Sequence, residues 1–363
     1  MMADGTRGVV SRLKSLPGAG ELAYSILAII AALLVGAVLI VAFGYDVWRA
    51  FGSLATGAFG SVYAISQTLM RTTPLLFAGL GVAVAFRVGL FNIGVEGQLY
   101  WGALATALAA LAFDALPTPF VILLSLAAGA VAGGLWGAVP GYLKARTGAH
   151  EVITTIMLNT IAVLGTTYLT ANYFKAEGPV DQTTKIAEHA QMPSLIPGTD
   201  ISLDIVVGIV VVALVAWFFK RTSLGYEFRA VGRNASAAEY GGVRSTRVIV
   251  LSMAMGGALA GLAGSSVVLT QLGRFVTGFS PGYGFTGIAV AVLGRGNPWG
   301  ALLAALLFGA LSAGGMSMQL FANIPNDLMT VVQGLVILFV AAPTAVVFIR
   351  RMVRRRKEGS GVG

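Results

Sequence analysis

Few residues of this 363-residue chain have the types and spacing that catalysis requires. His150 and Glu151 begin the zinc-protease pattern H-E-x-x-H, but Thr154 stands where the second histidine would be needed. The chain has no cysteine, which excludes a thiol catalyst, an iron–sulfur cluster and a disulfide framework. It also lacks the phosphate-binding pattern G-x-x-x-x-G-K-[ST], so we expect no ATP site. The sequence thus predicts no catalytic residue, no metal site and no cofactor in this chain.

A polar, glycine-rich stretch at residues 89–98 interrupts two strongly apolar segments. Irregular backbone persists at membrane depth only where it lines a cavity or is buried in protein, so we interpret this break as part of a pathway wall. Glu96 is a candidate solute ligand because ionisable groups inside membranes are usually functional, although the first turn of a helix favours a carboxylate without any transport role. Asn92 and Gln98 can donate and accept hydrogen bonds, which suits a sugar hydroxyl or neighbouring backbone.

A second glycine-rich break lies at residues 280–285. Span, break and span follow one another in residues 74–113 and again, with opposite predicted orientation, in residues 248–294. This arrangement predicts a transport pathway between two inverted halves. Three aromatic residues at the breaks could stack on a nucleobase, namely Phe91, Tyr283 and Phe285. Packing is the default role of an aromatic side chain in so apolar a chain.

The composition is that of an all-α polytopic membrane protein. Hydrophobic residues make up 56% of the chain and charged residues 11%, against about 25% charged residues in ordinary soluble domains. The mean hydropathy is +0.83, and several uncharged runs exceed the ~18 residues that mark a spanning helix. Lys and Arg outnumber Asp and Glu by 24 to 15, for a net charge of +9. The excess lies in short clusters between apolar runs, which fits the positive-inside rule better than nucleic-acid binding.

These patterns predict about ten transmembrane segments, some of them discontinuous helices, with every basic cluster on one side of the membrane. Residues 1–20 are expected to form a cytoplasmic leader, residues 21–349 a transmembrane domain and residues 350–363 a basic cytoplasmic tail. Within the domain, residues 173–203 are expected outside and residues 220–247 inside. Pro74 should break the second span into two pieces. The predicted spans are residues 22–43, 61–86, 99–113, 121–139, 152–173, 205–219, 248–270, 284–294, 298–314 and 326–349.

Three separated motifs resemble the permease subunits of ABC importers for nucleosides, within the wider family that also moves branched-chain amino acids and simple sugars. They are F-N-I-G-x-E-G-Q at residues 91–98, H-E-V-I-x-T-I-M-L-N at residues 150–159 and R-A-V-G-x-N-x-x-A-A-E-Y-G-G at residues 229–242. The resemblance covers about residues 60–349. It is specific for the family and less specific for the solute.

The resemblance implies a multi-pass permease of a prokaryotic cell (inner) membrane, with both termini cytoplasmic, that carries nucleosides and preferably purine nucleosides. It implies a second related permease subunit, cytoplasmic ABC ATPases that bind ATP and Mg, and an extracytoplasmic substrate-binding protein, often a lipoprotein. Nucleic acid is not an expected partner. Branched-chain amino acids or simple sugars are the alternative cargo. An ion-coupled secondary transporter is the rival mechanism, but it would need buried carboxylates, among which Glu96 is nearly alone.

The third motif predicts a short capped helix. Asn234 is a favourable N-cap for residues 235–240, and Gly241 and Gly242 can end the helix in the left-handed conformation. By resemblance this is the coupling helix that docks in a groove of the ATPase, whereas the alternative is a solvated turn. The residues assigned to coupling are Arg229, Gly232, Arg233, Asn234, Ala237, Ala238 and Glu239.

Overall fold

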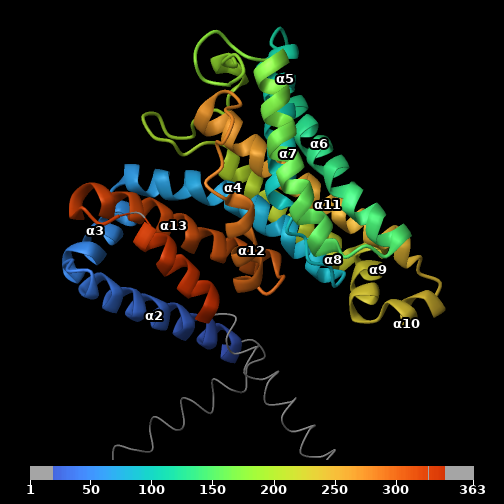
Figure 1. Cartoon of the computed structure of the whole chain (residues 1–363), viewed down its shortest axis with the longest axis horizontal. Helices are drawn as coiled ribbons and strands as arrows, with labels where there is room; N and C mark the ends of the chain where they lie inside the picture. Colours follow the sequence, from blue (N-terminus) through green and yellow to red (C-terminus); the bar gives the residue numbers. More distant parts are fainter. Residues whose placement is uncertain (1–18, 326, 340–363) are drawn as a thin grey trace, which may run out of the picture. The chain divides into compact units, whose positions relative to one another are not determined.

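The structure is a computed structural model that describes residues 19–325 and 327–339, and these residues form helices without a named strand (Figure 1). The chain divides into two compact units, one made of Met1–Leu54 with Gly315–Gly363 and the other of Ala55–Gly314. The predicted basic tail and nearly all of the predicted leader lie outside the described residues. We call the larger unit, Ala55–Gly314, the permease core, after the family that the sequence resembles.

Five helices among the described residues are long and apolar enough to cross a membrane, and a sixth candidate is a bent pair. The five are α4 (Val62–Arg87), α6 (Thr118–Thr147), α7 (Glu151–Tyr173), α11 with η2 (Ser245–Leu272) and α13 (Pro298–Ala322). The bent pair is α8 (Asp204–Arg221) with α9 (Ser223–Arg233), at 74° to each other. The prediction of about ten crossings is therefore not confirmed.

The remaining helices are not among these candidate spans. They are α2 (Ala19–Ala42), α3 (Val47–Phe59), α5 (Val95–Ala112), η1 (Glu188–Ala190), α10 (Ala235–Tyr240) and α12 (Tyr283–Leu293), and an apolar helix also covers Asp327–Phe339. Every predicted span coincides with a helix, at least in its described part. Two α-helices were not predicted, α3 and α9. Both contain charged or polar residues among the apolar ones, so neither forms the uninterrupted apolar run by which the spans were located.

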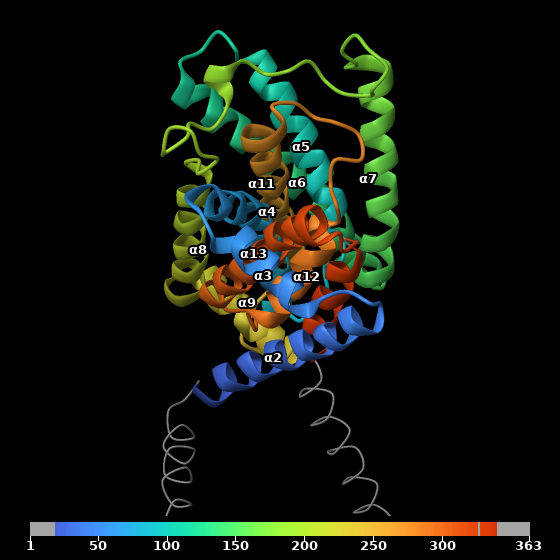
Figure 2. The same cartoon turned by 90° about the vertical axis from the view of Figure 1, so that its left-hand side faces the viewer.

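The centre of the permease core is α11, which packs against α4, α5 and α6 (Figure 2). Its four glycines allow these helices to approach backbone to backbone. A Cβ on Gly256 would clash with the carbonyl oxygen of Gly81 on α4, and one on Gly261 with that of Gly129 on α6. A Cβ on Gly264 would clash with the carbonyl oxygen of Leu99 on α5. A side chain at any of these positions would push α11 away from a neighbour.

The predicted break at Pro74 is wrong, because α4 is one continuous helix. Proline has no N–H, so the carbonyl of Met70, four residues earlier, loses its helical donor. The side-chain amide of Gln271 replaces that donor, with 3.2 Å between its Nε2 and the oxygen of Met70. The Thr72 hydroxyl donates to the carbonyl of Thr68 at 2.7 Å. A side-chain donor from η2 (Val268–Leu272) thus supports the helix at its weakest point.

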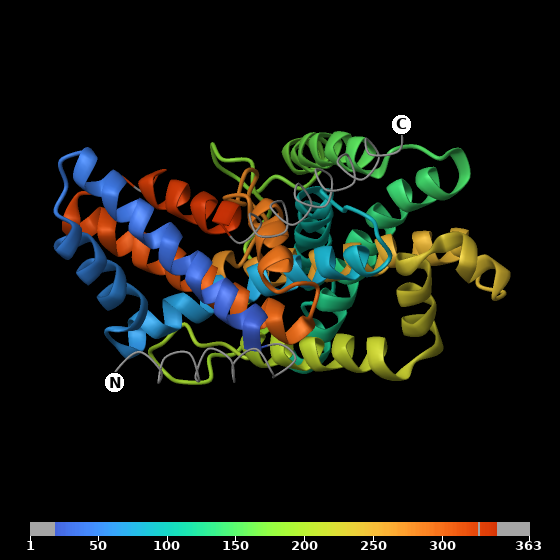
Figure 3. The ribbon, with the colours of Figure 1, turned by 90° about the horizontal axis from the view of Figure 1, so that it is seen from below.

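Residues 174–203 form an ordered cap over one end of the permease core. Backbone N–H groups of Thr183, Ile186 and Met192 donate to the carbonyls of Phe275, Gly273 and Leu269 at 2.9, 2.8 and 3.0 Å. Ile186 and Met192 are buried in a hydrophobic cluster with residues of α5, α6 and η2. At the end of α8, the chain continues into α9 and α10, which extend away from the bundle of the permease core (Figure 3).

Candidate functional site

The first break spans residues 88–94, because α4 ends at Arg87 and α5 already begins at Val95. The amides of Asn92 and Gln98 are buried and bind each other: Asn92 Nδ2 donates to Gln98 Oε1 at 3.0 Å, and Gln98 Nε2 donates to Asn92 Oδ1 at 3.2 Å. Asn92 Oδ1 also accepts from the N–H of Gly94 at 3.0 Å. Both amides therefore stabilise the break itself. Their partners here are neighbouring protein groups, which is one of the two alternatives expected, the other being a sugar hydroxyl.

A residue of α7, Asn159, holds this break from the side. Its Nδ2 donates to the carbonyl of Ile93 at 2.8 Å, and its Oδ1 accepts from the N–H of Gly97 at 2.8 Å. Asn159 is the last residue of the second sequence motif, and no role was predicted for it. A usable signal was present, because the buried residues of α7 follow helical spacing and all but one are polar: Thr155, Asn159, Ala162, Thr166 and Thr170.

Glu96 connects the first break to the second. Its side chain is buried at 6% exposure, and its Oε2 accepts a hydrogen bond from the N–H of Gly284 at 2.6 Å. Gly284 lies in the first turn of α12, whose other free N–H groups at Gly282 and Tyr283 donate to the hydroxyl of Ser280 at 3.1 Å. The structure thus brings the starts of α5 and α12 together through one carboxylate.

Both breaks are partly buried in protein. A Cβ on Gly256, in the middle of α11, would lie 3.5 Å from Nδ2 of Asn92, so the buried part of the first break is level with the centre of a candidate spanning helix. In the second break Gly284 is buried and contacts the backbone of Glu96. The buried part of each break meets the requirement that irregular backbone at membrane depth be enclosed by protein.

The three aromatic candidates divide into buried and exposed residues. Tyr283 is buried at 8% exposure, whereas Phe91 and Phe285 are exposed at 38% and 53%. The ring of Phe91 packs on that of Phe86 with 5.1 Å between centroids. Among the described ring contacts, none joins Phe91 to Phe285, and a role for any of the three in solute binding stays a prediction.

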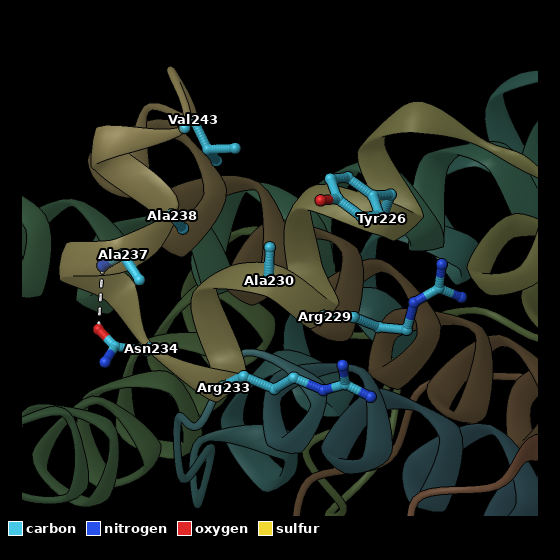
Figure 4. Close-up of a pocket in the computed structure, with 9 residues that line it drawn as sticks. Tyr226, Arg229, Ala230, Arg233, Asn234, Ala237, Ala238 and Val243 are labelled. Atoms are coloured by element: carbon cyan, nitrogen blue, oxygen red, sulfur yellow. Dashed lines mark hydrogen bonds between the residues drawn. The ribbon is translucent and has the colours of Figure 1, made fainter.

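The predicted short helix is present as α10, and Asn234 caps it (Figure 4). The Asn234 side chain accepts from the N–H of Ala237 at 3.0 Å. Only Gly242 adopts the left-handed conformation, with φ of 86°, while Gly241 is the C-cap with φ of −79°. Tyr240, the last residue of α10, is 96% exposed. This six-residue helix is thus capped at its start, and all of its residues except Ala238 are exposed.

A hollow of about 690 Å³ lies between α9 and α10. Its lining includes five of the predicted coupling residues, Arg229, Arg233, Asn234, Ala237 and Ala238. In Figure 4 the two arginines extend from α9 to the same side, with the two alanines across the hollow on α10. We call this space the coupling hollow.

The other two coupling candidates do not line the coupling hollow. Glu239 is exposed on α10. Gly232 serves close packing instead, because a Cβ there would clash with the carbonyl oxygen of Arg87, at the end of α4. A donor on Arg229, Nη1, binds the carbonyl oxygen of Phe219 on α8. These contacts fix α9 to the ends of both α4 and α8.

One buried carboxylate was missed. Asp204 begins α8 and is 2% exposed, and its Oδ2 accepts a hydrogen bond from the hydroxyl of Ser266 on α11. Asp204 directly follows a polar loop, so the sequence did not indicate that its side chain is buried. Glu96 is therefore one of two buried carboxylates in the permease core. Among the described residues, no group of three His, Asp or Glu side chains could hold a metal ion.

Known proteins and one protein family match most of the length of this chain. The family described as branched-chain amino acid transport system / permease component matches residues 64–341. The chain is 41% identical to a guanosine ABC transporter permease protein of Bacillus subtilis, over 92% of this chain and 97% of that protein. It is 37% identical to a nucleoside ABC transporter permease protein of Lactococcus lactis, over 87% and 89% of the two chains. It is 35% identical to a glucose ABC transporter permease protein of Haloferax volcanii, over 86% and 85%.

Proposed function

Because the chain belongs to the branched-chain amino acid transport system / permease component family, we propose that it is a permease subunit of an ABC importer and forms part of the pathway for nucleosides. Its similarity to two relatives named for guanosine and nucleosides, over almost its full length, carries this proposal. The guanosine relative favours purine nucleosides. The glucose relative and the family's own description support the alternative cargoes, a simple sugar or a branched-chain amino acid.

The proposed assembly contains a second related permease subunit, two cytoplasmic ABC ATPases that bind ATP and Mg, and an extracytoplasmic binding protein. ATP hydrolysis then belongs to the ATPases and not to this chain. We place the protein in a prokaryotic cell membrane with both termini, α9 and α10 in the cytoplasm and residues 174–203 outside. About ten crossings follow if α2, α5, α12 and the helix at Asp327–Phe339 are counted with the five or six candidate spans.

The mechanism is alternating access, in which α10 is the lever that the ATPases move. Its movement passes to α9, and from α9 to the end of α4 through the close contact of Gly232 with Arg87. The first break follows α4 directly, and Glu96 connects that break to α12. A displacement of α10 therefore reaches the junction of both breaks through rigid, packed elements, where two arrangements of the breaks would open the pathway to opposite sides.

The experiment that tests this proposal uses the complete transporter in proteoliposomes, with the binding protein outside and ATP enclosed. Uptake of radiolabelled guanosine that depends on ATP and is competed by adenosine, but not by glucose or leucine, is the expected result. Competition by glucose or leucine would reassign the cargo within the family. Uptake by this chain alone under a proton or sodium gradient, without ATP, would overturn the ABC assignment.

A further inference from the structure

A second hollow, of about 270 Å³, lies where four helices of the permease core meet. Its lining joins the end of α4, the end of α8, the middle of α9 and the start of α13. The residues that matter here are Arg87, Phe219, Lys220, Arg229, Pro298 and Trp299. Three of them are cations and no lining residue is a carboxylate. We call this space the basic hollow; it is separate from the coupling hollow, although Arg229 borders both.

Two of the cations are held in place by neutral groups, which do not balance their positive charge. Nε of Arg87 donates to the carbonyl of Gly296 at 3.0 Å, and its guanidinium lies 5.4 Å from the ring centroid of Phe219. Arg229 donates to the carbonyl of Phe219. Carbonyl oxygens are neutral, and each guanidinium keeps further N–H donors for another acceptor. None of the described ion pairs includes Arg87, Lys220 or Arg229.

The start of α13 adds a further positive contribution. Pro298 is the first residue of this 25-residue helix, and the N-terminus of a helix carries a partial positive charge that favours anions. Trp299 follows and is 47% exposed. Tryptophan is enriched where a membrane protein meets the lipid headgroups. The basic hollow therefore combines three cations, a helix N-terminus and an interfacial aromatic residue.

We propose that the basic hollow binds a phosphate group, and that in the membrane this phosphate belongs to the headgroup of an acidic phospholipid. Clusters of Lys and Arg at the cytoplasmic end of spanning helices attract anionic lipids. Guanidinium groups suit phosphate because their planar forks can donate two parallel hydrogen bonds. This lipid site is separate from the proposed transport function. Only its assignment to the cytoplasmic leaflet depends on the membrane orientation proposed above. A soluble phosphate would use the same chemistry.

The test measures lipid binding by native mass spectrometry of the purified full chain in detergent, titrated with phosphatidylglycerol or with phosphatidylcholine. The variant is Lys220→Glu, and the matched control is Arg221→Glu, which changes the neighbouring exposed cation outside the basic hollow. We expect phosphatidylglycerol to bind at least about fivefold more weakly to Lys220→Glu, since one cation near an anionic lipid contributes about 1 kcal/mol. Arg221→Glu should change the affinity by less than about twofold, because its charge lies outside the site.

A competition arm separates the two sources of phosphate. If millimolar inorganic phosphate displaces phosphatidylglycerol from the wild-type chain but not from Lys220→Glu, both bind the basic hollow. If inorganic phosphate binds there and phosphatidylglycerol does not, the lipid assignment is wrong. Equal binding of the two lipids, or equal losses in the Lys220 and Arg221 variants, would overturn the site. The site would also be overturned if Lys220→Glu abolished copurification of the ATPase while lipid binding was unchanged, because the basic hollow would then be a protein contact.

Discussion

Glu96 Oε2 accepts a hydrogen bond from the N–H of Gly284 at 2.6 Å, and the two residues are 188 positions apart in the chain. Each lies in the first turn of a helix that starts from a break. The first N–H groups of a helix have no partner within the helix, so the Glu96 carboxylate accepts from one of these donors of α12, that of Gly284, while it lies at the positive end of α5. The contact makes the two breaks a single structural unit.

Replacing Glu96 tests that unit. Glu96→Gln keeps an acceptor oxygen but removes the charge, and a hydrogen bond to a charged group is worth about 1 kcal/mol more than a neutral one. We expect a small loss of thermal stability in detergent, and a larger loss in Glu96→Ala, which leaves the N–H of Gly284 without its acceptor. Uptake should fall in the same order while the KM for nucleoside stays constant. A raised KM at unchanged stability would identify Glu96 as a solute ligand instead.

The contact between Gln271 and Met70 gives a second prediction, because it exists only to replace the donor that Pro74 lacks. Gln271→Ala should lower the free energy of unfolding by about 1 kcal/mol, the low end of the cost of an unsatisfied carbonyl, because this bond is only partly buried. Pro74→Ala restores a helical N–H to the same carbonyl. In that background Gln271→Ala should cost much less, and this difference is the interaction energy of a double-mutant cycle. Equal costs in both backgrounds would show that Gln271 does not support α4.

These two contacts also show where sequence reasoning stopped. Hydropathy located a helix at each predicted span, and capping rules located α10, because both depend on residues that are neighbours in the chain. The break assigned to Pro74 was wrong because its compensating donor, Gln271, lies 201 residues away. Asn159 and Asp204 were missed for the same reason, since their partners Ile93, Gly97 and Ser266 are 62 or more residues distant. Helical spacing can mark a buried polar face, as on α7, but it does not show which distant residue that face contacts.

The cap of α10 yields a third prediction. Asn234→Ala removes the acceptor for the N–H of Ala237 and should destabilise a helix of six residues by about 1 kcal/mol. The permease core should be unaffected, because α10 is exposed apart from Ala238. We expect weaker copurification of the ATPase and slower ATP-driven uptake, with unchanged thermal stability. Asn234→Asp, which retains a capping oxygen, should preserve both activities; if it behaves like Asn234→Ala, the cap is not what couples α10.

A fourth prediction concerns the wall of the coupling hollow. Ala237 is exposed and lines the hollow, so Ala237→Arg should obstruct the ATPase without disturbing the fold. Ala238 is buried at 7% exposure, so a bulky charged residue there should also unfold α10. The matched control is Ser236→Arg, an exposed neighbour that does not line the hollow. Copurification of the ATPase with membrane-inserted protein should be lost in Ala237→Arg and kept in the control. Copurification retained in both would remove the coupling hollow from the ATPase interface.

The last prediction separates stacking from packing at Phe91. Phe91 is 38% exposed and its ring packs on that of Phe86, so part of this residue is accessible for contact with a nucleobase. Stacking of a base on an aromatic ring contributes about 1–3 kcal/mol. If Phe91 binds the solute, Phe91→Leu should raise the KM for guanosine about 5- to 100-fold, and Phe91→Trp should restore it. The control is Phe113→Leu at the far end of α5, where the ring is similarly exposed at 41%. If Phe91→Leu transports guanosine with the kinetics of that control, Phe91 packs against Phe86 and does not contact the solute.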